Sequence, residues 1–197
     1  MIAAIVLAAG LSRRMGSRKL LAVIEGKPLV RWAVEGIVSL VDDVVVVTQP
    51  EDAPIREALA GLAVRFATNP RPEDGQGTSI ATGAAALAPE TDAALVVLGD
   101  QPWLPAAAIP ALLAEFRATH RAIVAPVYRG TQGNPVLFAA ATFGELRALG
   151  GDAGARRIVD RDPARVTRVF IDGEMPADVD TADDLARLTA TRRPRVQ

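Results

Sequence analysis

The chain has 197 residues, 50 % of them hydrophobic, and a formal net charge of -1. This length suits one domain with a sizeable core, and the near-zero charge gives no reason to expect nucleic acid or an anionic membrane as a partner. The absence of cysteine excludes disulfides and thiolate metal sites, and a single histidine argues against a histidine-rich metal site.

We predict one domain over residues 1–190 and a disordered tail over residues 191–197, which carry three arginines and a proline. The N-terminal apolar run is too short for a membrane helix, and no basic segment precedes it. We therefore expect a cytoplasmic protein with no membrane partner.

The chain alternates short apolar runs with stretches of helical spacing. The apolar run Ile2–Ala9 predicts a strand buried on both faces of a parallel sheet. Further strands are predicted at Val44–Thr48, Val64–Ala67, Ala93–Leu98, Ala122–Pro126, Val166–Ile171 and, antiparallel, Asn134–Phe138. Helices are predicted at Lys27–Val41, Glu51–Leu62, Thr78–Leu87, Pro105–Thr119, Phe143–Leu149, Ala153–Asp160 and Thr181–Ala190. This alternation predicts an α/β fold with a doubly wound, Rossmann-like and mostly parallel sheet.

The loop after the first strand is rich in glycine and basic residues. It contains Gly10, Ser12 and Gly16, together with Arg13, Arg14, Arg18 and Lys19. Glycines let a backbone approach an anion closely, and several cations can balance more than one phosphate charge. This loop is neither a Walker A loop nor a dinucleotide fingerprint. It predicts a polyphosphate cradle, and the alternative is a strand-to-helix turn with a solvated basic face.

Two acidic positions are candidate metal ligands. Asp100 follows the strand Ala93–Leu98, where a carboxylate can hold Mg²⁺ against a polyphosphate. The alternative for Asp100 is a turn residue before Pro102. Asp178 and Asp180 precede the last helix, where an acidic residue can equally serve as a helix cap.

The N-terminal segment resembles the signature of nucleotidyltransferases that activate sugars, alcohol phosphates and molybdopterin. Leu7-Ala8-Ala9-Gly10, Ser12, Arg14-Met15-Gly16 and Lys19 all match it. The resemblance implies a fold like that of the nucleotide-diphospho-sugar transferases. It also implies that Asp180 completes the Mg²⁺ site of Asp100, although Ala182 stands where the family usually has proline.

Four further segments narrow the resemblance to molybdenum cofactor cytidylyltransferases, a MobA-like subfamily. They are Gly77-Thr78-Ser79-Ile80, Asp100-Gln101-Pro102, Gly133-Asn134-Pro135-Val136-Leu137-Phe138 and Gly151-Asp152-Ala153-Gly154-Ala155-Arg156. Guanylyl-specific relatives usually differ at the first two segments, and Gln76 departs from the pattern. The resemblance implies that the nucleotide contacts Leu7, Ala8, Ala9, Gly10, Ser12, Asn69, Gly77, Thr78 and Ser79. It implies that the acceptor substrate contacts Gln101, Pro102, Asn134, Asp152 and Arg156. Turn, cap and strand-entry roles are the structural alternatives for these later segments.

The resemblance implies transfer of CMP from CTP to molybdenum cofactor, with release of pyrophosphate. Lys19, Arg14 and Asp100 would be catalytic, and the product would pass to a molybdenum hydroxylase or its chaperone. A phosphate nucleophile, with a second pKa near about 6, needs no general base. The alternatives are a GTP-using guanylyltransferase, a transferase for another small phosphate, and a cofactor-binding accessory protein without catalysis.

Overall fold

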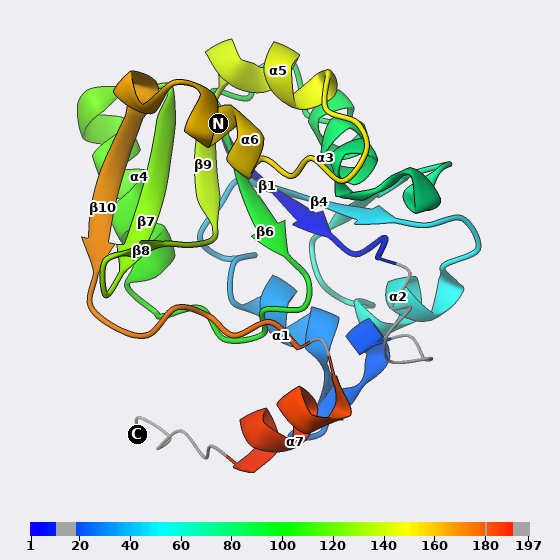
Figure 1. Cartoon of the computed structure of the whole chain (residues 1–197). Helices are drawn as coiled ribbons and strands as arrows, with labels where there is room; N and C mark the ends of the chain where they lie inside the picture. Colours follow the sequence, from blue (N-terminus) through cyan, green and yellow to red (C-terminus); the bar gives the residue numbers. More distant parts are fainter. Residues whose placement is uncertain (11–18, 180, 191–197) are drawn as a thin grey trace.

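The computed structural model describes residues 1–10, 19–179 and 181–190. A central sheet is covered by helices on both faces (Figure 1). Along each central strand, alternate side chains enter opposite layers, so Ile5 packs in one apolar cluster and Val6 in the other. The predicted α/β class with a mostly parallel, doubly wound sheet is confirmed.

The main sheet has eight strands within the described residues, in the order β10-β7-β9-β6-β1-β4-β5, with β8 paired to β7. The predicted antiparallel strand is β9, and the short β8 is antiparallel as well. The strands are β1 (Ile2–Leu7), β4 (Asp43–Thr48), β5 (Arg65–Thr68), β6 (Ala93–Leu98), β7 (Ile123–Tyr128), β8 (Thr131–Gln132), β9 (Val136–Ala139) and β10 (Val166–Ile171). A separate hairpin joins β2 (Val23–Ile24) to β3 (Lys27–Pro28).

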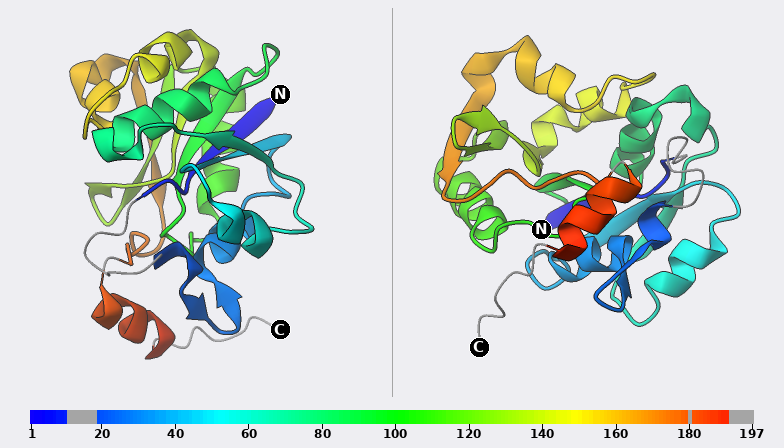
Figure 2. Two further views of the ribbon diagram at one scale, coloured as in Figure 1. Left: turned by 90° about the vertical axis from the view of Figure 1, so that its right-hand side faces the viewer. Right: turned by 60° about the horizontal axis from the view of Figure 1, so that its bottom comes forward.

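Two sets of helices cover the two faces of the sheet (Figure 2). One face carries α1 (Leu29–Glu35), α2 (Ala53–Ala58) and α4 (Ala108–Thr119). The other carries α3 (Gln76–Ala85), α5 (Phe143–Arg147) and α6 (Arg156–Arg161). The last helix, α7 (Ala182–Ala190), lies beyond the carboxyl ends of the strands. Within the described residues, no helix has the length and apolar character needed to cross a bilayer.

Several helices are shorter than the sequence predicts, and α3 keeps its predicted length but is shifted. The helix predicted from Lys27 begins only at Leu29, because Lys27 and Pro28 pair with β2 in extended conformation. α3 begins at Gln76 rather than Thr78, and its cap is Gly75. Apolar spacing extends past helix ends into the turns that cover the same core, so it overstates helix length.

Strand order places one crevice at the centre of the sheet. β1 lies between β4 and β6, so the chain leaves β1 toward β4 and later returns to pair β6 on the other side. The carboxyl ends of β1 and β6 therefore lie side by side where the strand order reverses, which is where open α/β sheets bind ligands. Residues 172–179, here called the strap, run from β10 past this edge toward α7 (Figure 1).

Tyr128 is the only tyrosine of the chain and provides a test of the core next to this edge. Its side chain is 1 % exposed, and its hydroxyl donates to the Asn134 carbonyl at 2.9 Å. Burial raises the pKa of Tyr128 from 10.0 to about 12, because the phenolate would lose its hydration.

We expect the ultraviolet absorbance of the folded chain to report one tyrosine that titrates near about 12. Because the folded-state pKa is raised, the neutral phenol favours folding below its ordinary pKa of 10.0, and this stability is lost as pH rises toward about 12. Circular dichroism at each pH separates titration from unfolding, and Tyr128→Phe removes the signal. A midpoint near 10.0 in the folded chain would contradict the burial.

Candidate active site

Lys19 and Asp100 meet at the carboxyl ends of β1 and β6. Lys19 Nζ donates to Asp100 Oδ2 at 2.7 Å, and the two side chains are 14 % and 19 % exposed. The Gly99 amide donates to the Leu7 carbonyl at 3.1 Å, and a Cβ on Gly99 would lie 2.7 Å from that oxygen. Glycine at this position therefore lets β6 close against β1 and directs Asp100 toward Lys19.

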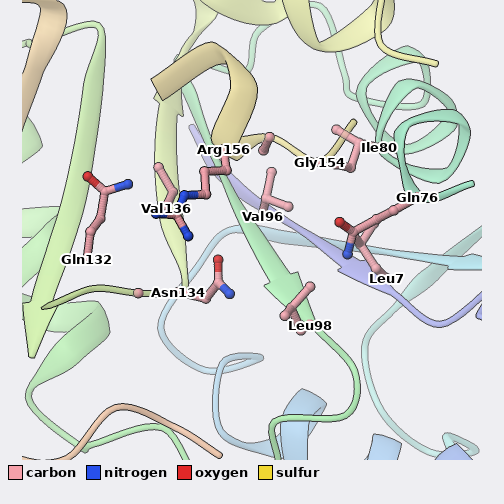
Figure 3. A pocket seen from close by; sticks show the side chains of 12 residues that line it. Leu7, Gln76, Ile80, Val96, Leu98, Gln132, Asn134, Val136, Gly154 and Arg156 are labelled. Atoms are coloured by element: carbon pink, nitrogen blue, oxygen red, sulfur yellow. The ribbon is translucent and has the colours of Figure 1, made fainter. Parts of the chain in front are cut away.

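A cleft of about 230 Å³ lies between α3, α6 and the sheet, and the last residues of β1 and β6, Leu7 and Leu98, line it (Figure 3). Its floor is apolar, and polar side chains from three segments surround it. The lining residues are Leu7, Gln76, Ile80, Val96, Leu98, Gln132, Gly133, Asn134, Val136, Gly154, Ala155 and Arg156. A mostly apolar floor with a few convergent polar groups is the usual form of a small-molecule site.

Arg156 and Asn134 are the predicted acceptor contacts that line this cleft. Arg156 is the first residue of α6, and its side chain extends over Val136 toward the middle of the cleft (Figure 3). It forms an ion pair with Asp160 at 3.5 Å, and its side chain is 79 % exposed. Exposed ion pairs contribute little, so the guanidinium can turn to an anionic ligand at small cost.

Asn69, a predicted nucleotide contact, forms hydrogen bonds with other segments of the chain. Its side chain is 1 % exposed, and Nδ2 donates to Thr78 Oγ1 at 2.9 Å and to Ser79 Oγ at 3.0 Å. Oδ1 accepts from the Arg71 amide at 3.0 Å. Ser79, another predicted nucleotide contact, is 6 % exposed. Their hydrogen bonds join the end of β5 to the start of α3.

The start of α3 is covered by another segment of the chain. The Gly77 amide donates to the Gly151 carbonyl at 2.9 Å, so this amide is not open to a phosphate. Gly75 has φ +102°, and a Cβ there would lie 2.4 Å from the Gly151 carbonyl carbon. Asp152 is exposed beside Gly75 and does not line the cleft.

Among the predicted nucleotide contacts at the end of β1, one lines the cleft and another already uses its backbone amide in a hydrogen bond within the sheet. Leu7 lines the cleft, whereas the buried Ala8 donates its amide to the Val47 carbonyl at 2.8 Å. Ala9 is also buried, and Gly10 is exposed. Thr78 is half-buried, and its hydroxyl donates to the Gly75 carbonyl at 2.8 Å.

Gln101 and Pro102, the two predicted acceptor contacts that follow Asp100, are buried. Gln101 is 3 % exposed, and its Nε2 donates to Asp178 Oδ1 at 2.7 Å. The Val179 amide donates to the Asp100 carbonyl at 3.3 Å. Gln101 therefore fastens the strap to the segment that carries Asp100. Trp103 also packs, edge to face, against Trp32.

Gln101→Glu is expected to lower the free energy of unfolding by about 2 kcal/mol at neutral pH, since a second carboxylate would replace the amide that donates to Asp178. The deficit should shrink as pH falls, because a protonated glutamic acid can again donate to Asp178. Denaturant titrations over a pH series measure both effects.

Asp178→Asn is the matched control for this hydrogen bond. It keeps an oxygen that accepts from Gln101, so we expect a loss below about 1 kcal/mol with little pH dependence. Equal losses for the two variants, or a Gln101→Glu deficit that ignores pH, would show that this contact does not hold the strap.

The remaining predicted site residues, Ser12, Arg14 and Asp180, lie outside the described residues. Within the described ranges, no group of three or more His, Cys, Asp or Glu side chains is arranged to hold a metal ion. Asp100 offers a single partly exposed carboxylate. One or two carboxylates completed by phosphate oxygens and water suit Mg²⁺, whereas Zn²⁺ sites need more protein ligands.

Sequence reasoning missed two polar residues of the cleft, Gln76 and Gln132. Gln76 stood out only as a departure from a family pattern, and Figure 3 shows its side chain extending toward Leu7. Gln132 lies in β8, inside a stretch that reads as a turn. Its position directly before Gly133-Asn134 was the available signal, but only the pairing of β8 with β7 brings it to the cleft.

Comparisons with known proteins point to one family. Residues 4–166 match the MobA-like NTP transferase domain. Purine catabolism protein PucB of Bacillus subtilis is 29 % identical over 79 % of this chain and 78 % of its own length. A probable molybdenum cofactor guanylyltransferase of Natranaerobius thermophilus is 28 % identical over 66 % of this chain and 62 % of its own. The crystal structure of Rv0371c from Mycobacterium tuberculosis has a TM-score of 0.84 at 27 % identity, covering 96 % and 98 % of the two chains. A complex of Rv0371c with manganese has a TM-score of 0.80 at 27 % identity, covering 97 % and 99 %.

Proposed function

The chain belongs to the MobA-like NTP transferase family, and on that premise we propose that it transfers CMP from CTP to the terminal phosphate of molybdenum cofactor. Membership of this family makes it a nucleotidyltransferase. The observation that carries the proposal is the Lys19–Asp100 pair at the β1/β6 edge, beside a cleft that Arg156 enters from α6. Leu98, two residues before Asp100, lines the cleft, and Arg156 adds a cation to its lining.

In the proposed reaction an acceptor phosphate oxygen attacks the α-phosphorus of the nucleotide. A new oxygen–phosphorus bond forms, the bond from the α-phosphorus to the bridging oxygen breaks, and pyrophosphate leaves with that oxygen. The nucleophile is already ionised at neutral pH, so no side chain must remove a proton. The single histidine, His120, is exposed at the end of α4 with φ 50°, consistent with a reaction that needs no histidine base.

Repulsion between two anions is the barrier that the protein must lower. The Lys19 ammonium has three donors, so it can keep Asp100 and also bind a phosphate oxygen of the leaving group. Arg14 would bind the same polyphosphate, and Arg156 would hold the acceptor phosphate across the cleft. Asp100, with Asp180, would hold Mg²⁺, which when bound neutralises phosphate charge. The manganese complex of Rv0371c supports a divalent cation in this family.

The choice of CTP rests on two segments that differ from the guanylyl pattern, Gly77–Ala81 and Asp100-Gln101-Pro102. Gly77 and Gln101 are buried and fasten neighbouring segments. We infer that they would select a base through the shape of the loops they hold rather than by direct contact. GTP is the second candidate, because the relative from Natranaerobius thermophilus is named a guanylyltransferase.

Pyrophosphate release with Mg²⁺ and molybdenum cofactor, run in parallel with CTP, GTP, ATP and UTP, tests the proposal. We expect release with CTP only and none after chelation of Mg²⁺. Release with GTP would overturn the base assignment. Binding of CTP without release would point to another phosphate acceptor, and absence of nucleotide binding would favour an accessory protein that carries the cofactor to a molybdenum hydroxylase.

A further inference from the structure

The edge strand β10 presents two large side chains to solvent. Arg168 and Phe170 alternate along one face of the strand, and the Phe170 side chain is 80 % exposed. On the opposite face Val169 and Ile171 pack in a cluster with Ala108 of α4 and Tyr128. Arg168 and Phe170 therefore lie on the face of the sheet opposite α4, the face that carries α3, α5 and α6.

These two side chains line a shallow groove that adjoins the catalytic cleft. The residues that line the groove are Val127, Gly130, Gln132, Arg156, Asp160, Arg168 and Phe170. Gln132 and Arg156 also line the cleft, so the two depressions share a wall. A ligand bound at Arg156 in the cleft can therefore continue into the groove without leaving the protein surface.

The groove has a net positive charge and an aromatic side chain. Arg156 and Arg168 outweigh Asp160, which pairs with Arg156 at 3.5 Å. Within residues 1–10, 19–179 and 181–190, no ion pair involves Arg168. A guanidinium beside an aromatic face suits a planar ring with carbonyl or anionic oxygens at its edge. The Gln132 amide adds both a donor and an acceptor for such an edge.

We propose that this groove is the second half of the acceptor site and binds the body of the acceptor, whereas Arg156 binds its phosphate. The acceptor is then an elongated phosphomonoester with a planar heterocyclic body that packs on Phe170 and meets Arg168. This inference rests on the proposed function. A compact sugar phosphate would fill only the cleft, so the groove favours the elongated acceptor over a sugar phosphate.

Two substitutions on β10, measured with molybdopterin as the probe, test the groove. Arg168→Ala should raise the KM for molybdopterin about tenfold, the effect of losing one charge-assisted hydrogen bond. Phe170→Ala should raise it about fivefold through lost ring packing. The KM for CTP and kcat at saturating acceptor should stay unchanged. Equilibrium dialysis of molybdopterin against each variant should show the same weakening without turnover.

Matched controls are Arg157→Ala, an exposed arginine next to Arg156 that does not line the groove, and Val23→Ala, an exposed apolar residue of β2. Both should leave the KM for molybdopterin unchanged. If the parent chain transfers the nucleotide to molybdopterin and both β10 variants keep its KM for molybdopterin, the groove does not bind the acceptor. The proposed function would then still stand. Absence of transfer and of binding in the parent chain would overturn the proposed function and this assignment together. Concentration-dependent dimers that Phe170→Ala abolishes, with unchanged acceptor KM, would instead assign this edge to a second copy of the chain.

Discussion

Asp100→Asn is expected to reduce nucleotidyl transfer at least about a thousandfold while leaving the fold intact. Asparagine keeps the size of the side chain and an oxygen for Lys19, but it removes the negative charge that would hold Mg²⁺ against the phosphates. Asp100→Ala should be at least as severe, because it also leaves the Lys19 ammonium without its 2.7 Å partner. The measurement is pyrophosphate release at saturating nucleotide and acceptor, with circular dichroism and thermal unfolding run alongside.

The matched control lies at the other end of the same strand. Asp92 directly precedes β6 and pairs with the N-terminal ammonium at 2.5 Å, far from the cleft. Asp92→Asn should keep transfer within about twofold of the parent chain. If Asp100→Asn stays within a few-fold of the parent, Asp100 is a turn residue and the metal assignment is wrong.

Lys19→Met is expected to lower kcat/KM for the nucleotide by about a hundredfold or more. Methionine retains the length and apolar stem of lysine, so the change removes mainly the charge and the donors directed at Asp100. Because Lys19 and Asp100 are in contact, their effects should be strongly non-additive, and Lys19→Met with Asp100→Asn should be little worse than Asp100→Asn alone. Steady-state kinetics over a nucleotide series provide the test.

Lys27→Met is the matched control, because it removes another lysine that forms an ion pair with a carboxylate. Lys27 pairs with Glu35 at 2.6 Å and lies 4.6 Å from the Trp32 ring centroid, in the β2–β3 hairpin region. Its loss should alter stability slightly and leave kcat/KM within about twofold. If Lys19→Met has normal nucleotide kinetics, Lys19 does not bind the nucleotide, and its role is only to neutralise Asp100 in the free protein.

The strands and the positions of Lys19 and Asp100 near the strand ends could be predicted because their signals are local. Runs such as Ala93–Leu98 are apolar at every position, since helices cover both faces of the sheet. Asp100 directly follows such a strand, and parallel strands end at one edge, so its position follows from the chain order. Helix ends were less predictable, because apolar spacing continues into turns that pack on the same core, as at Leu62.

Burial of the site residues could not be predicted, because it depends on partners far away in the chain. Asn69 reads as a nucleotide contact until its amide is seen to join Thr78 and Ser79. Gln101 reads as an acceptor contact until the strap brings Asp178 to it across 77 positions of sequence. A polar side chain looks the same in the sequence whether it meets a ligand or another segment of the protein.

The sequence by itself determined the α/β class, the glycine-rich segment after β1 and the positions of Lys19 and Asp100. The spacing of apolar residues, the spacing of glycines and the polar residues that directly follow a strand are all patterns of a few neighbouring residues. The tertiary structure alone decided which polar residues face the cleft. Pairing of β8 with β7 brings Gln132 to Arg156, and the edge position of β10 leaves Phe170 exposed beside them. These outcomes arise from strand order and from contacts between distant segments, and no local pattern records them.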